Sequence, residues 1–293
     1  MAVFLQQCIN GLMLGGTYAL IAIGYTLIFG VLNLLHLAHG EVFMIGAFAG
    51  LTVVLLTKLP LWAGMMAAMV GAGVVGILVE LIAFRPLQRK ALHITPLITT
   101  LAVALILQDI ALKLFGGEQT GFPQTIRAVN FPVGPVQIST LQLFIIGSSV
   151  TLMVLLYVFV EKTRMGKAMR AMAESAQTAR LLGINVDSVT LVTFGLASAL
   201  AGAAGVLVGL AYNAITPFMG VQMGLKGMVV MMLGGTGNVI GAMLGGLILG
   251  EIEVLSVAYL SSSYRDAFAF GILILIILFR PTGLMGSRLQ AER

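Results

Sequence analysis

The sequence is poor in the residues on which soluble proteins and most enzymes depend. Only 9% of its 293 residues are charged, whereas a soluble globular domain carries about 25%. Its one cysteine, Cys8, can form neither an intramolecular disulfide nor a cysteine metal cluster. Its three histidines, His36, His39 and His93, lack the HExxH spacing of a catalytic zinc site. No GxxxxGK(S/T) loop is present either, so the chain has no sequence signature of an ATPase.

Apolar residues dominate the chain instead. They make up 59% of it and give a mean hydropathy of +1.06, which predicts a polytopic membrane protein. The basic residues flank apolar runs rather than lining one face, so the net charge of +5 indicates membrane topology and not nucleic-acid binding. The N-terminus lacks the basic start and the cleavage site of a signal peptide, so we expect it to lead into a retained first span.

The apolar runs predict one transmembrane domain, 1–293, built as an all-α bundle of about 8–10 helices, because a spanning helix needs about 20 apolar residues. The stretch 222–258 is interrupted by Gly234, Gly235 and Gly237, which predicts a short descending arm followed by a full ascending helix. Counting both arms gives about nine crossings. The other spans are predicted near 11–32, 41–57, 61–84, 94–115, 141–160, 189–211 and 266–280.

The distribution of lysine and arginine predicts the orientation. The stretches 85–90 and 161–188 and the tail from Arg280 together hold 11 of the 16 basic residues. Because basic residues collect on the cytoplasmic side, we expect all three there. An odd number of crossings then places the N-terminus outside. The stretch 116–140 becomes an external loop, with turns or a short extended piece suggested by its glycine, proline and threonine content.

The most highly charged stretch is 161–188, with 8 of the chain's 27 charged residues. Its spacing predicts a short cytoplasmic helix that stops at Gly183, with an apolar stripe opposite Arg170 and Glu174. The stripe could lie on the membrane surface or in the groove of a partner protein. We favour a partner, because alanines bury little area in lipid. The stripe consists of Met165, Met169, Met172, Ala176 and Ala179.

Four stretches resemble a family of transporters. Residues 173–189, AESAQTARLLGINVDSV, look like the coupling loop of ABC importer permeases, although Ser175 replaces the second residue of its Glu-Ala-Ala pattern and Gly183 is spaced further along. Three longer stretches together resemble the permeases of high-affinity branched-chain amino acid importers, particularly the leucine/isoleucine/valine type. Related permeases for urea and short amides share this outline. The three stretches are 11–48, 164–185 and 228–253, and the similarity runs from about residue 6 to 286.

The resemblance implies the permease fold of sugar and vitamin importers, in a bacterial inner membrane. It implies a non-catalytic subunit without a cofactor of its own, because two cytoplasmic ATPases bind the ATP and magnesium. A second homologous permease, expected as a heterodimer, and a periplasmic substrate-binding protein complete the importer. The cargo would be branched-chain or other hydrophobic amino acids, moved by alternating access. The residues that would couple to the ATPases are Met165, Met169, Arg170, Met172, Glu174, Ala176, Ala179 and Gly183.

Two polar breaks within apolar runs are candidates for the translocation pathway. NLLHLAHGEVF, 33–43, indicates either a broken helix that offers its N-terminus to a carboxylate or an ordinary cytoplasmic turn. YNAITPFMGVQMGLKG, 212–227, would interrupt a second helix and free its carbonyl groups. Two such breaks are typical of transporters built from repeats, although the halves share too little sequence to establish a repeat. The candidate residues are Asn33, His39, Gly40, Glu41, Pro217 and Gly220.

Acidic residues within apolar segments provide the main alternative. A charge at the bilayer centre costs at least ~2.5 kcal/mol, so we expect these residues to face protein, water or a partner. An ion-coupled carrier acting alone would need such groups as ion ligands, yet the strongest polar feature is cytosolic. An intramembrane enzyme would need a GxSxG, HExxH or paired-aspartate signature, which the sequence lacks. The four residues are Glu80, Asp109, Glu251 and Glu253.

Overall fold

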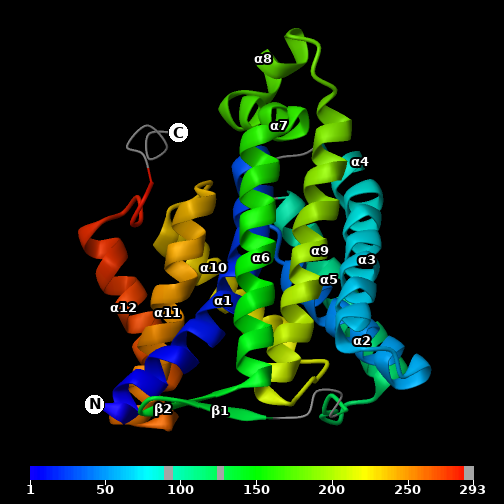
Figure 1. Ribbon diagram of the computed structural model, residues 1–293. Coiled ribbons are helices and arrows are strands. Elements are labelled where there is room, and N and C mark those ends of the chain that lie inside the picture. Colours follow the sequence, from blue (N-terminus) through cyan, green and yellow to red (C-terminus); the bar gives the residue numbers. More distant parts are fainter. Residues whose placement is uncertain (89–94, 124–128, 287–293) are drawn as a thin grey trace.

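The protein is a bundle of long apolar helices with a small β-hairpin at one end (Figure 1). The computed structural model describes residues 1–88, 95–123 and 129–286. A π-helical turn, Glu80–Phe84, joins α3 to α4, and a 3₁₀ turn, Ser262–Tyr264, precedes α12. The elements are α1 (Ala2–Leu32), α2 (His39–Thr57), α3 (Leu61–Val79), α4 (Arg85–Gln88), α5 (Thr95–Phe115), β1 (Asn130–Val133), β2 (Val136–Ser139), α6 (Thr140–Lys162), α7 (Arg164–Glu174), α8 (Ala176–Leu181), α9 (Val186–Tyr212), α10 (Met219–Gly234), α11 (Val239–Tyr259) and α12 (Arg265–Phe279).

The predicted spans are confirmed. In the described ranges, eight helices are long and apolar enough to cross a membrane, and α10 is a shorter apolar helix. The largest difference from the prediction is at the start of α1, which begins at Ala2 instead of residue 11. The stretch 222–258 contains the predicted descending arm, α10, and the predicted full helix, α11. The turn between them contains Gly235 and Gly237, both with positive φ, a conformation that glycine adopts without steric cost.

Polar side chains cap the helices where the sequence turns from polar to apolar. Ser139 accepts a hydrogen bond from the backbone N–H of Gln142, and the Gln142 side chain accepts one from the backbone of Ser139. This reciprocal capping box begins α6. Asn185 caps α9 by accepting a hydrogen bond from the backbone N–H of Ser188, and Asn238 caps α11 by accepting one from Gly241. Each of these helices therefore starts at a residue whose side chain satisfies a free backbone donor.

Glycines let the helices approach closely. α1 packs most extensively on α11, and α3 packs most extensively on α9. A Cβ added to Gly15 of α1 would lie 2.8 Å from the backbone of Leu247 in α11. A Cβ added to Gly202 of α9 would overlap the carbonyl of Ala68 in α3. Lipid provides no hydrophobic force between helices, so this close van der Waals contact stabilises the bundle.

The same order of helices occurs twice, in opposite directions. α1 and α9 are the longest helices, and each ends at an asparagine in the left-handed conformation, Asn33 with φ 52° and Asn213 with φ 48°. Seven residues later, Gly40 lies at the start of α2 and Gly220 at the start of α10. α3 and α5 complete the first unit, and α11 and α12 complete the second. Figure 1 shows α1 running towards α7 and α9 running away from it, so the two units form an inverted repeat.

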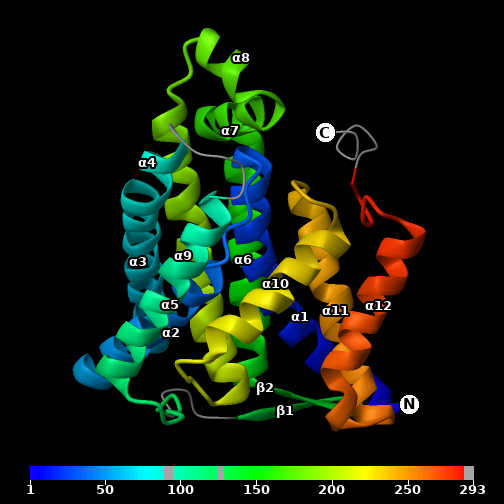
Figure 2. The same cartoon turned by 180° about the vertical axis from the view of Figure 1, so that it is seen from behind.

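The two ends of the bundle differ. The N-terminus and the hairpin of β1 and β2 lie at one end, and α7 and α8 lie at the other (Figures 1 and 2). Gly134, with φ +59°, provides the first position of the tight turn between the antiparallel strands. This hairpin confirms the extended piece predicted within 116–140. Of the basic stretches used for orientation, residues 89–90 and 287–293 lie outside the described residues.

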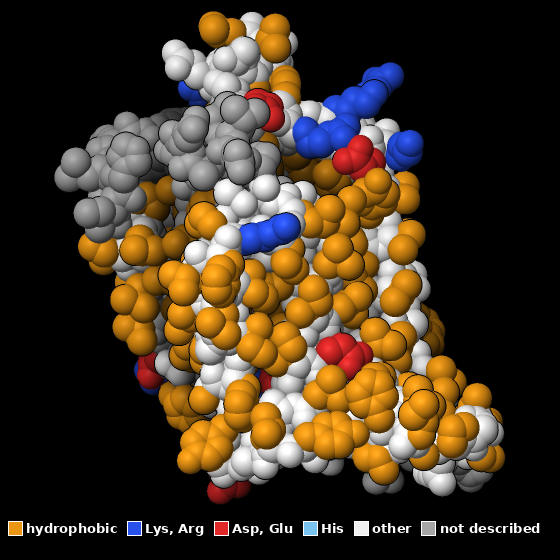
Figure 3. All heavy atoms as spheres, turned by 90° about the vertical axis from the view of Figure 1, so that its left-hand side faces the viewer, with side chains coloured by type: hydrophobic (Ala, Val, Ile, Leu, Met, Phe, Trp, Pro, Cys, Tyr) orange, Lys and Arg blue, Asp and Glu red, His pale blue; other side chains and the backbone are white. Residues whose placement is uncertain are grey.

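The space-filling view agrees with a membrane location. Hydrophobic side chains cover the middle of the face formed by α11, α12 and the first part of α1 (Figure 3). Most of the basic side chains in this view lie towards the end that carries α7 and α8. Such an apolar belt with charged ends is expected of a protein that crosses the membrane several times.

Candidate functional site

The two polar breaks meet inside the bundle. His39 and Gly40 are the first residues of α2, and Gly220 is the second residue of α10. A Cβ added to Gly40 would overlap the carbonyl oxygen of Gly220, and one added to Gly220 would overlap the carboxylate of Glu41. The starts of α2 and α10 therefore lie backbone against backbone. The structure brings together four of the six predicted pathway residues.

The first residue of α2 lies beside an interior turn of α1 and not beside its last residue. A Cβ added to Gly24 of α1 would overlap the imidazole of His39. Gly24 precedes the last residue of α1, Leu32, by eight positions, which is about 12 Å along a helix. Segment 33–38 thus turns back into the bundle before α2 begins. This geometry agrees with a broken helix and not with an ordinary turn at the membrane surface.

Asn33 and Pro217 lie apart from this contact. Asn33 is exposed and ends α1, whereas Pro217 is buried in the turn before α10. The loop between α5 and α6 covers the second break through an isolated β-bridge. The backbone N–H of Thr120 donates to the carbonyl of Ile215 at 2.9 Å, and the N–H of Ile215 donates to the carbonyl of Thr120 at 2.8 Å. The loop between α5 and α6 therefore fixes the chain where it re-enters the bundle.

The first break buries two histidines among aromatic rings. His36 lies 5.2 Å from Phe84 and 5.3 Å from Phe194 between ring centroids, and His39 lies 4.6 Å from Tyr25. Both histidines are at most 1% exposed, and neither imidazole makes a hydrogen bond of normal geometry with the described residues. In the same ranges, no group of three or more His, Cys, Asp or Glu side chains could hold a metal ion.

A charged cluster lies at the second break, among α10, α11 and α12. Lys226 Nζ lies 2.6 Å from Glu253 Oε1 and 3.1 Å from Asp266 Oδ1. Arg265, the first residue of α12, forms a second ion pair with Glu253. Lys226 is 7% exposed and Glu253 is fully buried. Because an isolated charge at the membrane centre costs ~2.5–3.5 kcal/mol by insertion scales, these groups need one another as partners.

Two tyrosines complete this cluster. The hydroxyls of Tyr18 from α1 and Tyr212 from α9 lie 3.1 Å apart. Lys226 Nζ donates to Tyr18 at 3.4 Å, and Arg265 donates to Tyr212. The same two cations lie over the tyrosine ring faces, 5.4 Å and 5.1 Å from the centroids. The cluster thus combines ion pairs, hydrogen bonds and cation–π contacts from five helices.

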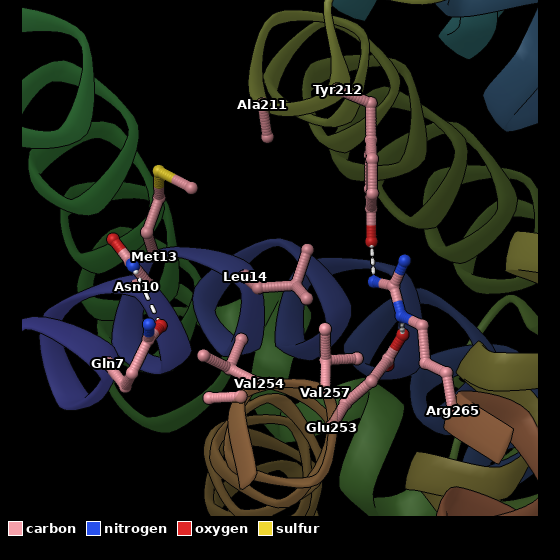
Figure 4. A pocket seen from close by; sticks show the side chains of 11 residues that line it. Gln7, Asn10, Met13, Leu14, Ala211, Tyr212, Glu253, Val254, Val257 and Arg265 are labelled. Atoms are coloured by element: carbon pink, nitrogen blue, oxygen red, sulfur yellow. Dashed lines mark hydrogen bonds and ion pairs between the residues drawn. The ribbon is translucent and has the colours of Figure 1, made fainter. Parts of the chain in front are cut away.

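Two cavities flank the cluster. The first has a volume of about 260 Å³ and lies between α1, α9 and α11 (Figure 4). The second, of about 370 Å³, lies between α9, α10 and α12. Tyr212 and Arg265 line both of them. These two side chains therefore form a polar partition between two cavities with largely apolar walls.

The four acidic residues of the apolar segments have different surroundings. Glu80 and Glu253 are buried at 1% and 0% exposure, as expected of groups that avoid lipid. Glu251 faces Gly11 of α1. Asp109, on the exposed side of α5, pairs with Lys113 one helical turn later, at 2.7 Å. The sequence predicts that these groups face protein, water or a partner, and the first three face protein.

The predicted cytoplasmic helix is divided into two. Thr163 caps α7, and Ser175 ends it and caps α8 by accepting a hydrogen bond from the N–H of Thr178. Arg170 forms an ion pair with Glu161 at the end of α6. The predicted stop is confirmed, because Gly183 has φ +83° just after α8.

The apolar stripe of this region faces its own chain. Met169, Met172 and Ala179 are 2%, 3% and 1% exposed. They pack with Val31 at the end of α1 and Val186 at the start of α9. The interpretation of the whole stripe as a free docking surface is therefore wrong for these three residues. The end of α1 and the start of α9 carry apolar side chains that need to be buried. The stripe covers them, and this is why it is not free to bind a partner.

Other residues of the stretch remain accessible. Met165 is half-buried, and Ala176 and Glu174 are exposed. Leu181 and Leu182 are 83% and 76% exposed, far more than Met169, Met172 and Ala179. The helical pattern alone did not single out these two leucines, because they follow the last full turn of the stripe.

Sequence reasoning also missed Tyr18, Tyr212, Lys226 and Arg265. A signal was available for Lys226, because it lies in an apolar helix directly before the helix that carries Glu253. Opposite charges in consecutive membrane helices are expected to pair. No comparable signal marked the tyrosines, which lie 194 positions apart in the sequence.

Comparisons with known proteins agree with this arrangement. Residues 7–277 match the family described as "Branched-chain amino acid transport system / permease component". The "High-affinity branched-chain amino acid transport system permease protein LivH" of Escherichia coli (strain K12) is 39% identical over 97% of this chain and 96% of that protein. The corresponding permease protein BraD of Pseudomonas aeruginosa shows the same identity and coverage.

A solved structure supports the fold. The structure described as "PsaBC from Streptococcus pneumoniae in complex with Fab" covers 99% of this chain and 95% of its own, with a TM-score of 0.52 and 12% identity. That likeness concerns the fold alone. The match over nearly the whole length, at 39% identity, identifies the chain as a multi-pass membrane protein that belongs to the branched-chain amino acid transport permease family.

Proposed function

We propose that this chain is a permease subunit of an ATP-driven importer that carries branched-chain amino acids into a bacterial cell across its cytoplasmic membrane. The observation that carries the proposal is the 39% identity, over 97% of the chain, to permeases named for high-affinity branched-chain amino acid transport. The subunit itself is non-catalytic and holds no cofactor. ATP and magnesium bind to two partner ATPases, because the chain lacks a P-loop sequence.

The orientation follows from charge. α7 and α8 carry several of the basic residues and lie at the end opposite to the hairpin. Basic residues favour the cytoplasmic side, so this end is cytoplasmic and the N-terminus is periplasmic. The hairpin and the loop that bridges Ile215 then face a periplasmic substrate-binding protein, which selects the cargo.

α8 is the element best suited to contact an ATPase. It projects from the bundle (Figure 1), and Leu181 and Leu182 expose large apolar side chains at its end. The buried stripe attaches α7 and α8 to α1 and α9. The two leucines, with Ala176 and Glu174 beside them, therefore replace Met169 and Met172 as the proposed docking residues.

A second homologous permease would cover the most exposed helices. Only 11% of the apolar window of α5 and 6% of that of α12 are buried within this chain, against 83% for α1. α5, α10 and α12 lie on one side of the bundle (Figure 2). Pairing on this face would place the starts of α2 and α10 close to the junction of two permeases, where alternating access can open a path to either side.

The first experiment tests docking. The chain is expressed with its native partners, carrying Leu181→Asp and Leu182→Asp together, and purified from gently solubilised membranes. We expect loss of the ATPases from the purified complex, because two buried charges would disrupt an apolar contact. Leu59→Asp, at an exposed leucine in the turn before α3, is the matched control and should retain them. Normal ATPase recovery with the double variant would contradict the role of α8.

The second experiment tests cargo and energy source. The complete complex is reconstituted into vesicles with its binding protein, and uptake of radiolabelled L-leucine and urea is compared with ATP, without ATP, and with an ion gradient alone. We expect leucine uptake that depends on ATP. Uptake of urea in preference to leucine would reassign the substrate, and uptake driven by an ion gradient without ATP would reassign the transport mechanism.

A further inference from the structure

The cavity in Figure 4 has an apolar middle and two polar ends. Leu14, Val254 and Val257 line the middle. Gln7 and Asn10 of α1 lie at one end, and Arg265, Glu253 and Tyr212 lie at the other (Figure 4). Pockets for drug-sized ligands measure about 300–1,000 Å³, so a volume of about 260 Å³ suits a smaller molecule. The shape of this lining indicates a small ligand with one polar head and one apolar part.

The charged cluster at the polar end of the cavity has no net charge. Lys226 and Arg265 balance Glu253 and Asp266. A ligand with a net charge would leave this cluster unbalanced in a region of low dielectric constant. A zwitterion would not, because its own two charges cancel. The cluster is therefore suited to a ligand that carries both an anionic and a cationic group.

Arg265 has a donor to spare. Its Nε contacts Glu253, and its Nη2 donates to Tyr212 and Tyr18. Among the described residues, its Nη1 makes no hydrogen bond or ion pair. Figure 4 shows this nitrogen without a dashed line. Hydrogen bonds from a guanidinium to a carboxylate are charge-assisted and strong, so Nη1 is a preformed donor for one carboxylate oxygen.

Glu253 supplies the opposite charge. Its carboxylate lines the same end of the cavity and is fully buried. Its Oε1 contacts both cations, whereas its Oε2 makes no hydrogen bond. A buried carboxylate oxygen without a partner is costly and is ready to accept a hydrogen bond from an ammonium group. Two groups of opposite sign thus stand at one end of a small apolar cavity.

We propose that this cavity is a binding site within the permease for the imported amino acid. The α-carboxylate binds Arg265, the α-ammonium binds Glu253, and the branched side chain lies against Leu14, Val254 and Val257. The ligand would take the place of the direct contact between Arg265 and Glu253, so that each charge keeps a partner. This inference rests on the proposed function, because it takes the cargo to be an aliphatic amino acid.

The ligand chemistry can be tested on the complete transporter complex, purified without its periplasmic binding protein. Binding of radiolabelled L-leucine is measured by scintillation proximity, with 4-methylpentanoate and isopentylamine as competitors. The first is leucine without its ammonium group, and the second is leucine without its carboxylate. We expect saturable leucine binding, with each competitor at least about 10-fold weaker than unlabelled leucine, because each forms one ionic contact instead of two. Absence of leucine binding, or equal competition by either compound, would overturn the proposal.

Two variants locate the site. Arg265→Gln removes the carboxylate partner but leaves Glu253 paired with Lys226, and we expect leucine binding at least about 10-fold weaker. Val254→Phe adds bulk within the cavity and should abolish binding. Leu244→Phe, at an exposed position of the same helix, is the matched control and should bind leucine normally. Normal binding by both cavity variants would place the site elsewhere and overturn the proposal.

The importer function can be tested separately from the binding site. ATP-dependent leucine uptake by the wild-type complex, together with no leucine binding in the absence of the binding protein, would reject the site and leave the importer function intact. Failure of the wild-type complex to transport leucine at all would reject the proposed function itself.

Discussion

The two inverted units place polar residues at equivalent breaks but stabilise them differently. In the first unit, His36, His39 and Glu41 are buried beside aromatic rings and glycines, and their imidazole nitrogens and Glu41 Oε2 lack hydrogen bonds among the described residues. In the second unit, Lys226 and Glu253 belong to a cluster in which every charge has an opposite partner. The same backbone plan therefore holds two different electrostatic environments.

The two breaks have similar backbone geometry but different polar side chains. The breaks share what backbone geometry requires, namely a left-handed asparagine and a glycine seven positions later. They do not share the polar side chains that follow. A repeat of this kind can keep its helix positions while one half holds a close backbone contact and the other holds a network of charges. Three sets of substitutions test the comparison, from the largest expected effect to the smallest.

The largest difference is expected between two glutamates. Glu253→Gln removes the anion shared by two cations, and we expect the free energy of unfolding to fall by about 3–5 kcal/mol, as when one partner of a buried ion pair is lost. Glu41→Gln should leave stability unchanged or raise it, because Glu41 Oε2 has no hydrogen bond to lose. Both values are measured by SDS denaturation in mixed micelles, followed by circular dichroism. Equal losses in the two variants would contradict the comparison.

A smaller effect is expected from the glycines at the contact between breaks. A Cβ at Gly40 would overlap a backbone carbonyl, so Gly40→Ala should cost about 1–3 kcal/mol. At Gly220 the same atom would overlap the side chain of Glu41, which can move, so the cost should be lower. Gly147 has no neighbour within 4 Å, and Gly147→Ala in α6 should stabilise by up to about 1 kcal/mol.

The ranking of these three variants in the same denaturation assay is the critical result. If Gly147→Ala lowers the free energy of unfolding as much as Gly40→Ala does, the close helix contact at Gly40 is not the cause of its destabilisation.

The smallest effect is expected at the two asparagines, where the units should behave alike. Asn33→Ala and Asn213→Ala should each cost about 1 kcal/mol, because the left-handed conformation is unfavourable for a residue with an ordinary Cβ. Replacement by glycine, which adopts positive φ freely, should cost little at either position. The midpoints of thermal unfolding for all four variants check this. A cost at only one asparagine would show that the breaks are not equivalent.

Much of the fold could be predicted from the sequence, because length and apolar composition alone are enough to predict a membrane span. The spans, the broken stretch 222–258 and the stop at Gly183 all follow from local signals. The partners across the bundle do not. Periodicity showed that Met169 and Met172 share a face, but it could not show that α1 and α9 cover that face. Likewise, nothing local connects Tyr18 with Tyr212 or places Arg265 beside Glu253.

The buried stripe of α7 and α8 has a mechanical consequence. Met169 and Met172 of α7 and Ala179 of α8 pack with the end of α1 and the start of α9, so a displacement of α7 and α8 acts directly on these two long helices. These helices have 31 and 27 residues and are roughly 46 Å and 40 Å long at 1.5 Å per residue. Each of these two helices ends at one of the two breaks, so we expect a displacement of α7 and α8 to reach the starts of α2 and α10 together.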